Sequence, residues 1–167
     1  MRYRSERELG LALATLPPGA RVVCSGNYAT PFHLLGIVDK ALECYHLNVL
    51  NAQPGVPERR GVVHETTFVG PGVRHSPRLS YVPSRLSMLP QLLRTSLAPD
   101  LVLVKTSTPY EGTVSLGTEV NVLPAAIEAA RRRGGLVIAE TNPRMPYTYG
   151  DAVLPVEQID YAIGVDE

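Results

Sequence analysis

The chain has 167 residues, a length typical of one domain with a sizeable apolar core. Its 16 basic and 16 acidic residues cancel, which excludes the strongly basic surface of a typical nucleic-acid-binding protein. No apolar run reaches the roughly 18 residues that a membrane span needs, and neither Cys24 nor Cys44 belongs to a CxxC motif. We therefore expect one domain over residues 1–167 that works in the cytoplasm, with no membrane or nucleic-acid partner.

The first half of the chain alternates predicted helices and strands. Ser5–Glu8 has the sequence of a helix capping box, and Pro17 and Pro18 end the helix that follows it. The further predicted elements are, in order, a strand at Arg21–Cys24, a helix from Pro31 to about Glu43, a strand at Leu47–Leu50, a loop at 51–60, and strands at Thr66–Val69 and Ser80–Pro83.

The second half shows the same alternation. Its predicted elements are a helix capped by Ser84 and reaching Leu93, a strand at Asp100–Lys105, a helix from about Glu119 to Arg133, and strands at Leu136–Ala139, Ala152–Pro155 and Tyr161–Val165. Strands that alternate with helices indicate βαβ units. The predicted fold class is therefore α/β, with a largely parallel wound sheet flanked by helices.

A shaped loop follows the predicted strand at Leu136–Ala139. Pro143 and Pro146 forbid both a helix and a central strand, so the chain must leave the sheet there. In open α/β sheets, ligands bind outside the carboxyl ends of the strands. The loop from Asn142 to Asp151 is thus either part of a ligand site or a rigid surface connection.

Several common site motifs are excluded by their spacing. His75 stands where a dinucleotide fingerprint beginning at Gly70 needs its third glycine, and Gly112–Gly117 has one residue too many for a nucleophile elbow. The four histidines lack metal-ligand spacing, and Arg131–Arg133 is best explained as a solvated basic helix end. We predict no metal site and no permanently bound cofactor.

A set of short phrases in a fixed order is more specific than any of these motifs. The phrases are Phe68–Arg74, Tyr81–Pro83, Leu86–Ser87, Leu89–Pro90, Asp100–Val104, Ser115–Gly117 and Ala139–Pro146, the last followed by Thr148 and Gly150–Asp151. In order and spacing they resemble the N-terminal domain of the acetyl-CoA hydrolase/transferase family, which includes acetate- and 4-hydroxybutyrate-type CoA-transferases. The resemblance extends from Arg21 to Asp166.

This resemblance implies a fold and a function. Members of the family have two similar α/β domains, and they move CoA between an acyl-CoA and a free carboxylate or hydrolyse the thioester. A glutamate attacks the thioester carbonyl, forming an acyl-glutamyl anhydride and then a glutamyl-CoA thioester. The expected ligands are an acyl-CoA and a small carboxylate. The expected partner is a second CoA-transferase domain, and we expect the complete enzyme to be a homo-oligomer.

The family's catalytic glutamate lies in the second domain, and no segment of this chain matches it. Glu65, Glu111, Glu119 and Glu140 are better explained as solvated carboxylates or helix caps. The loop at Thr108–Gly112 also departs from the family, whose members usually carry an aspartate and a histidine there and one residue more. We therefore expect no catalytic residue in this chain and no turnover by it alone. The alternative function is a non-catalytic binding or assembly module.

The candidate residues of this chain for the substrate or the domain cleft lie mostly in loops. They are Gly26, Pro31, Gly70, Arg74, Ser115, Gly117, Asn142, Met145, Pro146 and Gly150. Gly26 either lets the backbone approach a ligand or forms a tight turn. Arg74 could meet a carboxylate or a CoA phosphate, although an exposed ion pair is the commoner role of an arginine. For Met145 and Pro146 we favour packing against the partner domain.

Overall fold

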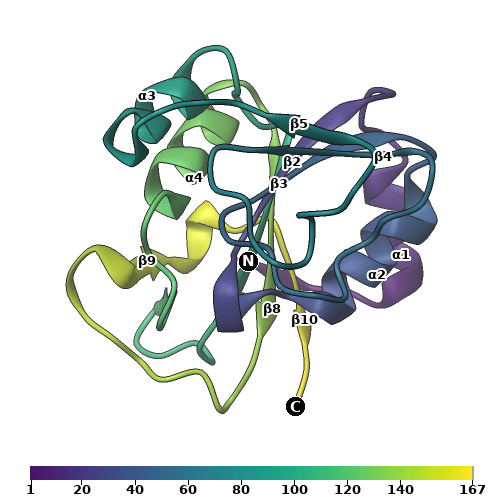
Figure 1. Ribbon diagram of the computed structural model, residues 1–167. Coiled ribbons are helices and arrows are strands. Elements are labelled where there is room, and N and C mark those ends of the chain that lie inside the picture. The colour runs from purple at the N-terminus through teal and green to yellow at the C-terminus, as the bar shows by residue number, and fades with distance from the viewer. Residues whose placement is uncertain (167) are drawn as a thin grey trace.

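A parallel eight-stranded sheet forms the middle layer of the structure, a computed structural model in which residues 1–166 are described. Helices α1 (Glu6–Leu13) and α2 (Phe32–Ala41) cover one face of the sheet, and α3 (Leu89–Arg94) and α4 (Leu123–Arg132) cover the other (Figure 1). The strand order is β1-β10-β8-β6-β2-β3-β4-β5, and every neighbouring pair is parallel. The predicted α/β fold with a wound parallel sheet is confirmed.

The strands of the main sheet are short. Their bounds are β1 (Arg2–Tyr3), β2 (Ala20–Cys24), β3 (Tyr45–Val49), β4 (Val62–Thr66), β5 (Leu79–Tyr81), β6 (Leu101–Thr106), β8 (Leu136–Thr141) and β10 (Tyr161–Gly164). Two further strands, β7 (Thr113–Ser115) and β9 (Val153–Pro155), form a separate antiparallel pair. The predicted strand at Ala152–Pro155 therefore exists but lies outside the wound sheet.

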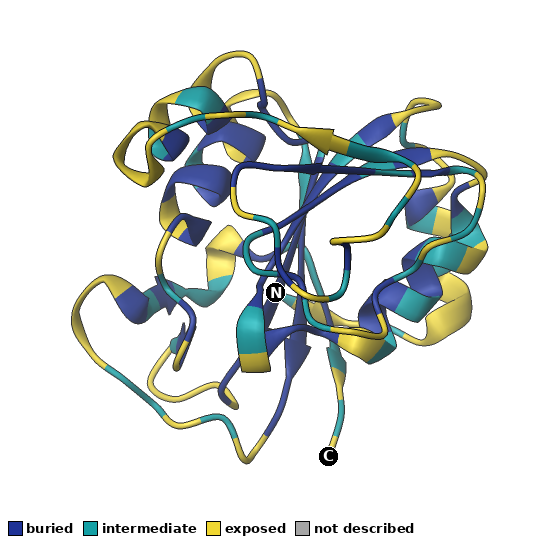
Figure 2. Cartoon of the chain, viewed as in Figure 1, coloured by how far each residue is buried: buried dark blue, intermediate teal, exposed yellow. Residues whose placement is uncertain are grey.

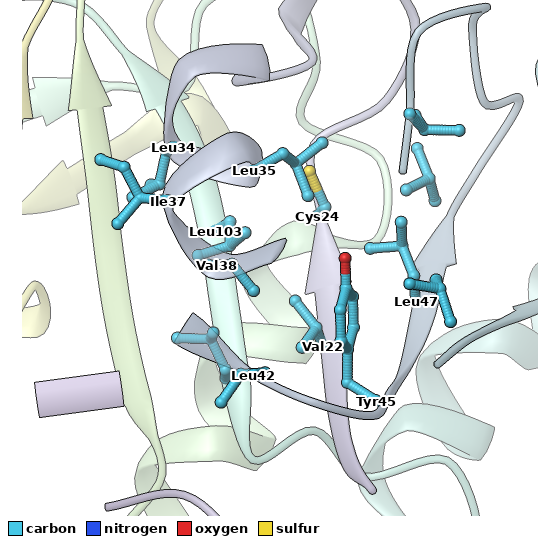
Figure 3. Close-up of a cluster of buried hydrophobic side chains, with 14 of the residues drawn as sticks. Val22, Cys24, Leu34, Leu35, Ile37, Val38, Leu42, Tyr45, Leu47 and Leu103 are labelled. Atoms are coloured by element: carbon cyan, nitrogen blue, oxygen red, sulfur yellow. The ribbon is translucent and has the colours of Figure 1, made fainter. Parts of the chain in front are cut away.

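Both faces of the central strands are buried. All six residues of β6 are buried, and Figure 2 shows the strands as the dark centre of the molecule. One face packs Val22, Cys24 and Leu103 beneath α2, in the apolar cluster of Figure 3. The other face packs Val23 and Val102 beneath α3 and α4. This two-sided burial explains why the strands are nearly continuous apolar runs rather than alternating ones.

The first helix begins as its sequence predicts. The Glu8 amide donates to Ser5 Oγ over 3.4 Å, and the Ser5 amide donates to the Glu8 carboxylate over 2.9 Å. This reciprocal pair satisfies two donors at the start of α1. The hydrogen bonds from Ser5 also lower the pKa of Glu8, since they favour its ionised form.

Two predicted helix starts are wrong for one physical reason. The helix expected from Ser84 begins only at Leu89, after a 3-10 turn at Leu86–Met88, and the helix expected from Glu119 begins at Leu123. In each case a proline, Pro90 or Pro124, is the second residue of the helix. Proline lacks an amide hydrogen and is tolerated only in the first turn, so it fixes where each helix can begin.

The strand predicted at Thr66–Val69 is also wrong, because the strand ends where the prediction begins it. The observed strand is β4, at Val62–Thr66. Beyond it, Thr66 Oγ1 accepts the Phe68 amide over 3.2 Å. This local bond between a side chain and the backbone turns the chain out of the sheet.

The order of the strands reverses at β2, and this reversal places the candidate site. The chain builds outward from β2 through β3, β4 and β5, and then crosses back to β6 on the other side of β2. The helix after β2 and the helix after β6 consequently lie on opposite faces of the sheet (Figure 1). Such a topological switch point leaves a crevice at the carboxyl ends of the strands.

No helix in the described part of the chain is long and apolar enough to cross a membrane.

Candidate functional site

A pocket of about 260 Å³ lies beside the switch point, at the carboxyl ends of β6 and β8. Its lining comes from the loops after β2, β7 and β8 and from the end of β6, and consists of Tyr28, Lys105, Thr118, Asn142, Arg144, Met145 and Pro146. We call it the switch-point pocket. Asn142, Met145 and Pro146, which the sequence nominated, thus meet in one place.

A buried ion pair stands at the edge of this pocket. Lys105 and Glu140 are directly opposite each other on β6 and β8, and Lys105 Nζ lies 3.2 Å from Glu140 Oε1. Glu140 is fully buried, and its Oε2 accepts the Leu34 amide over 2.9 Å. Leu34 lies in the first turn of α2, where amides have no partner within the helix. From the sequence, Glu140 is expected to be either a solvated carboxylate or a helix cap. The first role is wrong, because Glu140 is buried and caps the start of α2 from β8.

Lys105 is a candidate that the sequence interpretation missed. It is only 8% exposed, although lysine is rarely buried in proteins. The available signal was a lysine closing the otherwise apolar run Leu101–Val104. Nearby, burial and the negative charge of Glu140 raise the pKa of the Cys24 thiol, which keeps this thiol protonated and unreactive.

A second buried carboxylate, Glu119, ties together the loops around the switch point. It accepts a hydrogen bond from Asn27 Nδ2 over 2.8 Å and another from the Asn121 side chain. Asn27 Oδ1 in turn accepts from Asn51 Nδ2 over 2.5 Å. Asn27 and Asn51 have φ values of 48° and 54°, in the left-handed region that asparagine tolerates better than most residues. The solvated interpretation of Glu119 is thus wrong as well.

Ser115 fixes the loop that follows β8. Its Oγ donates to the Thr148 carbonyl over 2.8 Å and accepts the amides of Thr148 and Gly117 over 2.9 and 3.0 Å. Gly117 has a φ of 63°, and Met145 packs directly against it, so a side chain at this position would displace Met145. At the start of the loop, Asn142 Oδ1 accepts the Arg144 amide over 2.8 Å. The loop is therefore attached to Ser115 through Thr148 and has a local hydrogen bond at its start.

The same loop forms one wall of a second, larger pocket of about 490 Å³. Three tyrosines lie along it, with Tyr147 edge-to-face between Tyr110 and Tyr149 at ring-centre distances of 6.0 and 5.4 Å. Tyr147 is anchored by a 2.6 Å hydrogen bond between its hydroxyl and that of Thr113. Tyr149 is 81% exposed. We call this the tyrosine pocket, and Figure 2 shows its loop as a mostly exposed stretch at the lower edge of the view.

The other nominated residues lie elsewhere or serve the scaffold. Gly26 packs against the Leu50 carbonyl and Gly70 against the backbone of Ala52, so both allow loops to approach closely. Pro31 is the N-cap of α2, and Gly150 begins a short 3-10 turn (Gly150–Ala152) with a φ of 73°. Their roles at a ligand stay predictions.

Several predicted roles of charged residues can be compared with the structure. Arg74 is exposed and pairs with no carboxylate among residues 1–166, so the expected ion pair is absent there. Glu111 is exposed in a turn, as predicted, whereas Glu65 is buried against Arg21. The arginines of Arg131–Arg133 are exposed, but each contacts a carboxylate: Asp160, Glu128 and Asp100 in turn.

Comparison with known proteins decides the family. The model of the acetyl-CoA hydrolase/transferase N-terminal domain matches residues 20–167. The chain belongs to the acetyl-CoA hydrolase/transferase family. Its sequence is similar to the 4-hydroxybutyrate coenzyme A transferase of Clostridium kluyveri, with 30% identity over 165 residues that cover 91% of this chain and 38% of that protein. The chain thus spans well under half the length of this family member.

Solved structures share the fold of this chain. RipA from Yersinia pestis superposes with a TM-score of 0.84 at 18% identity, over 99% of this chain and 43% of RipA. The 4-hydroxybutyrate CoA-transferase of Porphyromonas gingivalis superposes with a TM-score of 0.67 at 22% identity, over 99% of this chain and 40% of that one. At these identities the likeness shows the fold alone, which is CoA-transferase-like.

Proposed function

We propose that this chain is the N-terminal part of an acyl-CoA:carboxylate CoA-transferase or acetyl-CoA hydrolase, and that a second domain supplies the catalytic glutamate. The observation that carries the proposal is the meeting of two family phrases, Ser115–Gly117 and Asn142–Pro146, beside the switch-point pocket. Ligands of open α/β sheets bind at such positions. The chain would then form one wall of the catalytic cleft, with an acyl-CoA and a small carboxylate as ligands.

The chemistry follows from a carboxylate nucleophile. The glutamate attacks the thioester carbonyl carbon and the C–S bond breaks. CoA leaves as a thiolate, and an acyl-glutamyl anhydride remains. The thiolate then attacks the glutamyl carbonyl, which forms the glutamyl-CoA thioester and releases the acyl group as a carboxylate. An acceptor acid runs these steps in reverse, whereas water in its place gives hydrolysis. No permanently bound cofactor is needed.

The environments of the glutamates support an external nucleophile. Glu140 and Glu119 are engaged in the hydrogen bonds described above, and Glu65 is held by Arg21. Glu111 is exposed but stands in a turn with a φ of 46°. A carboxylate that already stabilises the fold is a poor candidate for repeated acylation, so we expect the chain alone to have no turnover.

The exposed part of the Asn142–Asp151 loop suits contact with the second domain. Pro146 and Tyr149 are exposed, Met145 and Tyr147 are half-buried, and Tyr110 adds a further exposed ring. Tyrosine and methionine are enriched in the cores of protein interfaces. We propose that the second domain packs here, closes the cleft, and is part of a homo-oligomeric cytoplasmic enzyme.

The test is a CoA-exchange assay with acetyl-CoA and a series of carboxylates. The 167-residue chain should be inactive, and activity should appear when the second domain is supplied, in the same polypeptide or separately. In parallel, sedimentation should show self-association of the chain alone at micromolar concentration and a single species with the second domain. Activity of the chain alone that one of the four glutamate variants abolishes would contradict the proposal. Inactivity with every second domain that binds would favour the non-catalytic module.

A further inference from the structure

We propose that Met145 determines the length of the acyl chain that the enzyme accepts, because its side chain separates the switch-point pocket from the tyrosine pocket. This role rests on the function proposed above and adds a specificity-determining residue to it. The ligand group concerned is the apolar tail of the acyl group, so the role requires no charge in either pocket. The residues that carry the proposal are Met145, its neighbours Pro143 and Pro146, and Gly117.

Met145 lies at the boundary between the two pockets. Met145 and Pro146 are the two residues that both linings contain. The residues just before them divide between the pockets, since Asn142 and Arg144 line the switch-point pocket and Pro143 lines the tyrosine pocket. This segment of the loop therefore runs between the two pockets, and Met145 forms part of the wall of each.

The side chain of Met145 packs over Gly117 on the opposite loop. Its Sδ and Cγ occupy the space that a side chain at Gly117 would need. The Met145 amide donates to the Asn142 carbonyl over 3.1 Å, and Pro146 restricts the backbone of the residue before it. The backbone of Met145 is thus fixed, whereas its unbranched side chain keeps three rotatable bonds. Such a side chain can adjust to a short acyl group and still block a longer one.

The two pockets differ as the two halves of an acyl site would. The switch-point pocket has about 260 Å³ and polar lining groups such as Asn142 and Thr118. The tyrosine pocket has about 490 Å³, and the rings of three tyrosines give it apolar surface. An acyl group whose carbonyl lies in the first pocket reaches the second only past Met145. Each further methylene buried there would strengthen binding about fourfold, so Met145 decides at which chain length this gain stops.

The test shortens Met145 and compares it with a methionine outside the site. Met145→Ala removes the wall and should join the two pockets. Met145→Leu keeps an apolar side chain of similar volume and should preserve the wall. Met88→Ala is the control for position, since Met88 is 50% exposed and lines neither pocket. Circular dichroism and the melting temperature check that each variant folds.

The first readout is CoA exchange by the enzyme completed with its second domain. We expect Met145→Ala to raise the kcat/KM for hexanoyl-CoA relative to that for acetyl-CoA at least about tenfold, the gain from about two buried methylenes. Met145→Leu and Met88→Ala should change this ratio less than about twofold. An unchanged ratio in Met145→Ala, whether exchange is kept or falls equally for both donors, would overturn the role of Met145 and leave the proposed function standing.

The second readout requires neither activity nor a variant. The chain has three methionines, Met1, Met88 and Met145, so labelling their methyl groups with carbon-13 gives three NMR signals. Titration of the 167-residue chain with S-hexanoyl-N-acetylcysteamine, a neutral thioester, should shift the Met145 signal alone, and the S-acetyl compound should shift it less. No Met145 shift up to about 10 mM thioester would overturn the proposal. A Met145 shift in a protein that shows no CoA exchange with its second domain would support the acyl site and contradict the proposed function.

Discussion

Glu65 and Glu140 are both buried carboxylates of one sheet, yet their surroundings differ. Glu65, on β4, accepts two hydrogen bonds from the guanidinium of Arg21, over 2.6 Å from Nε and 3.3 Å from Nη2. The same arginine donates to the Ser96 carbonyl. Glu140, on β8, shares its two oxygens between a lysine and a helix amide beside a pocket. Arginine pairs with a carboxylate through a rigid two-pronged contact, whereas lysine makes a compact point contact.

The difference shows that burial alone does not mark a functional carboxylate. The Arg21–Glu65 pair is closed, since each partner satisfies the other and neither lines one of the two pockets of the candidate site. The Lys105–Glu140 pair differs, because its cation lines the switch-point pocket. We therefore expect changes at the first pair to affect stability alone, and changes at the second to affect both stability and ligand binding.

The largest expected effect is that of Glu140→Ala. This change removes the buried counter-charge of Lys105 and the acceptor of the Leu34 amide, and should cost about 3–5 kcal/mol of unfolding free energy. Chemical denaturation measures it. Glu140→Gln is the control that keeps an acceptor and should cost clearly less. A loss below about 1 kcal/mol for the alanine variant would mean that the pair is weakly coupled to the fold.

Arg21→Met should have a smaller effect that is confined to stability. It leaves Glu65 without its guanidinium, but the Arg21 side chain is 25% exposed, so water can partly replace it and we expect a loss of about 2 kcal/mol. Adding Glu65→Gln should recover part of the lost stability, and no recovery would show that the loss does not come from the unpaired Glu65 carboxylate.

Asn142→Ala probes the loop on the Glu140 side of the comparison. The lost hydrogen bond to the Arg144 amide should cost about 1 kcal/mol, whereas CoA exchange in the complete enzyme should fall about tenfold or more because a pocket wall loses its polar group. Asn142→Asp keeps the acceptor and serves as the structural control. Parallel losses of melting temperature and activity would instead identify the loop as structural.

The smallest expected effect is a pH dependence on the Glu65 side. Burial lowers the pKa of His64, on β4, below its ordinary 6.5, a shift that Arg78 supports and Glu58 opposes. As the pH falls below about 6.5, the unfolded chain binds a proton that the folded chain resists, so stability should decrease. In the His64→Leu variant, the loss of unfolding free energy between pH 7 and pH 5 should be smaller than in the wild type, by less than about 1 kcal/mol. A slope unchanged in the variant would place its origin elsewhere.

The sequence allowed the fold to be predicted better than the site. Apolar runs such as Leu101–Val104 identify buried strands because packing acts along the chain, and the family phrases have fixed spacing. The buried carboxylates could not be found this way. Lys105 and Glu140 are 35 positions apart in the sequence, and only the pairing of β6 with β8 makes them neighbours. From the sequence alone, Glu119 is expected to be an exposed helix residue. Pro124 fixes the start of α4 at Leu123, so Glu119 lies before the helix.

Gly26, Gly70 and Gly72 all pack against the backbone of residues 50–53, and this determines which substitutions these glycines tolerate. Gly26 packs on Leu50, Gly70 on Ala52 and Gly72 on Gln53, in each case backbone against backbone, so that no side chain fits. A saturation scan that scores abundance should find these positions as intolerant as the core. A scan that scores ligand affinity among the surviving variants should show no response at these positions. One of the family phrases, Phe68–Arg74, would then reflect how two loops pack together rather than what the protein binds.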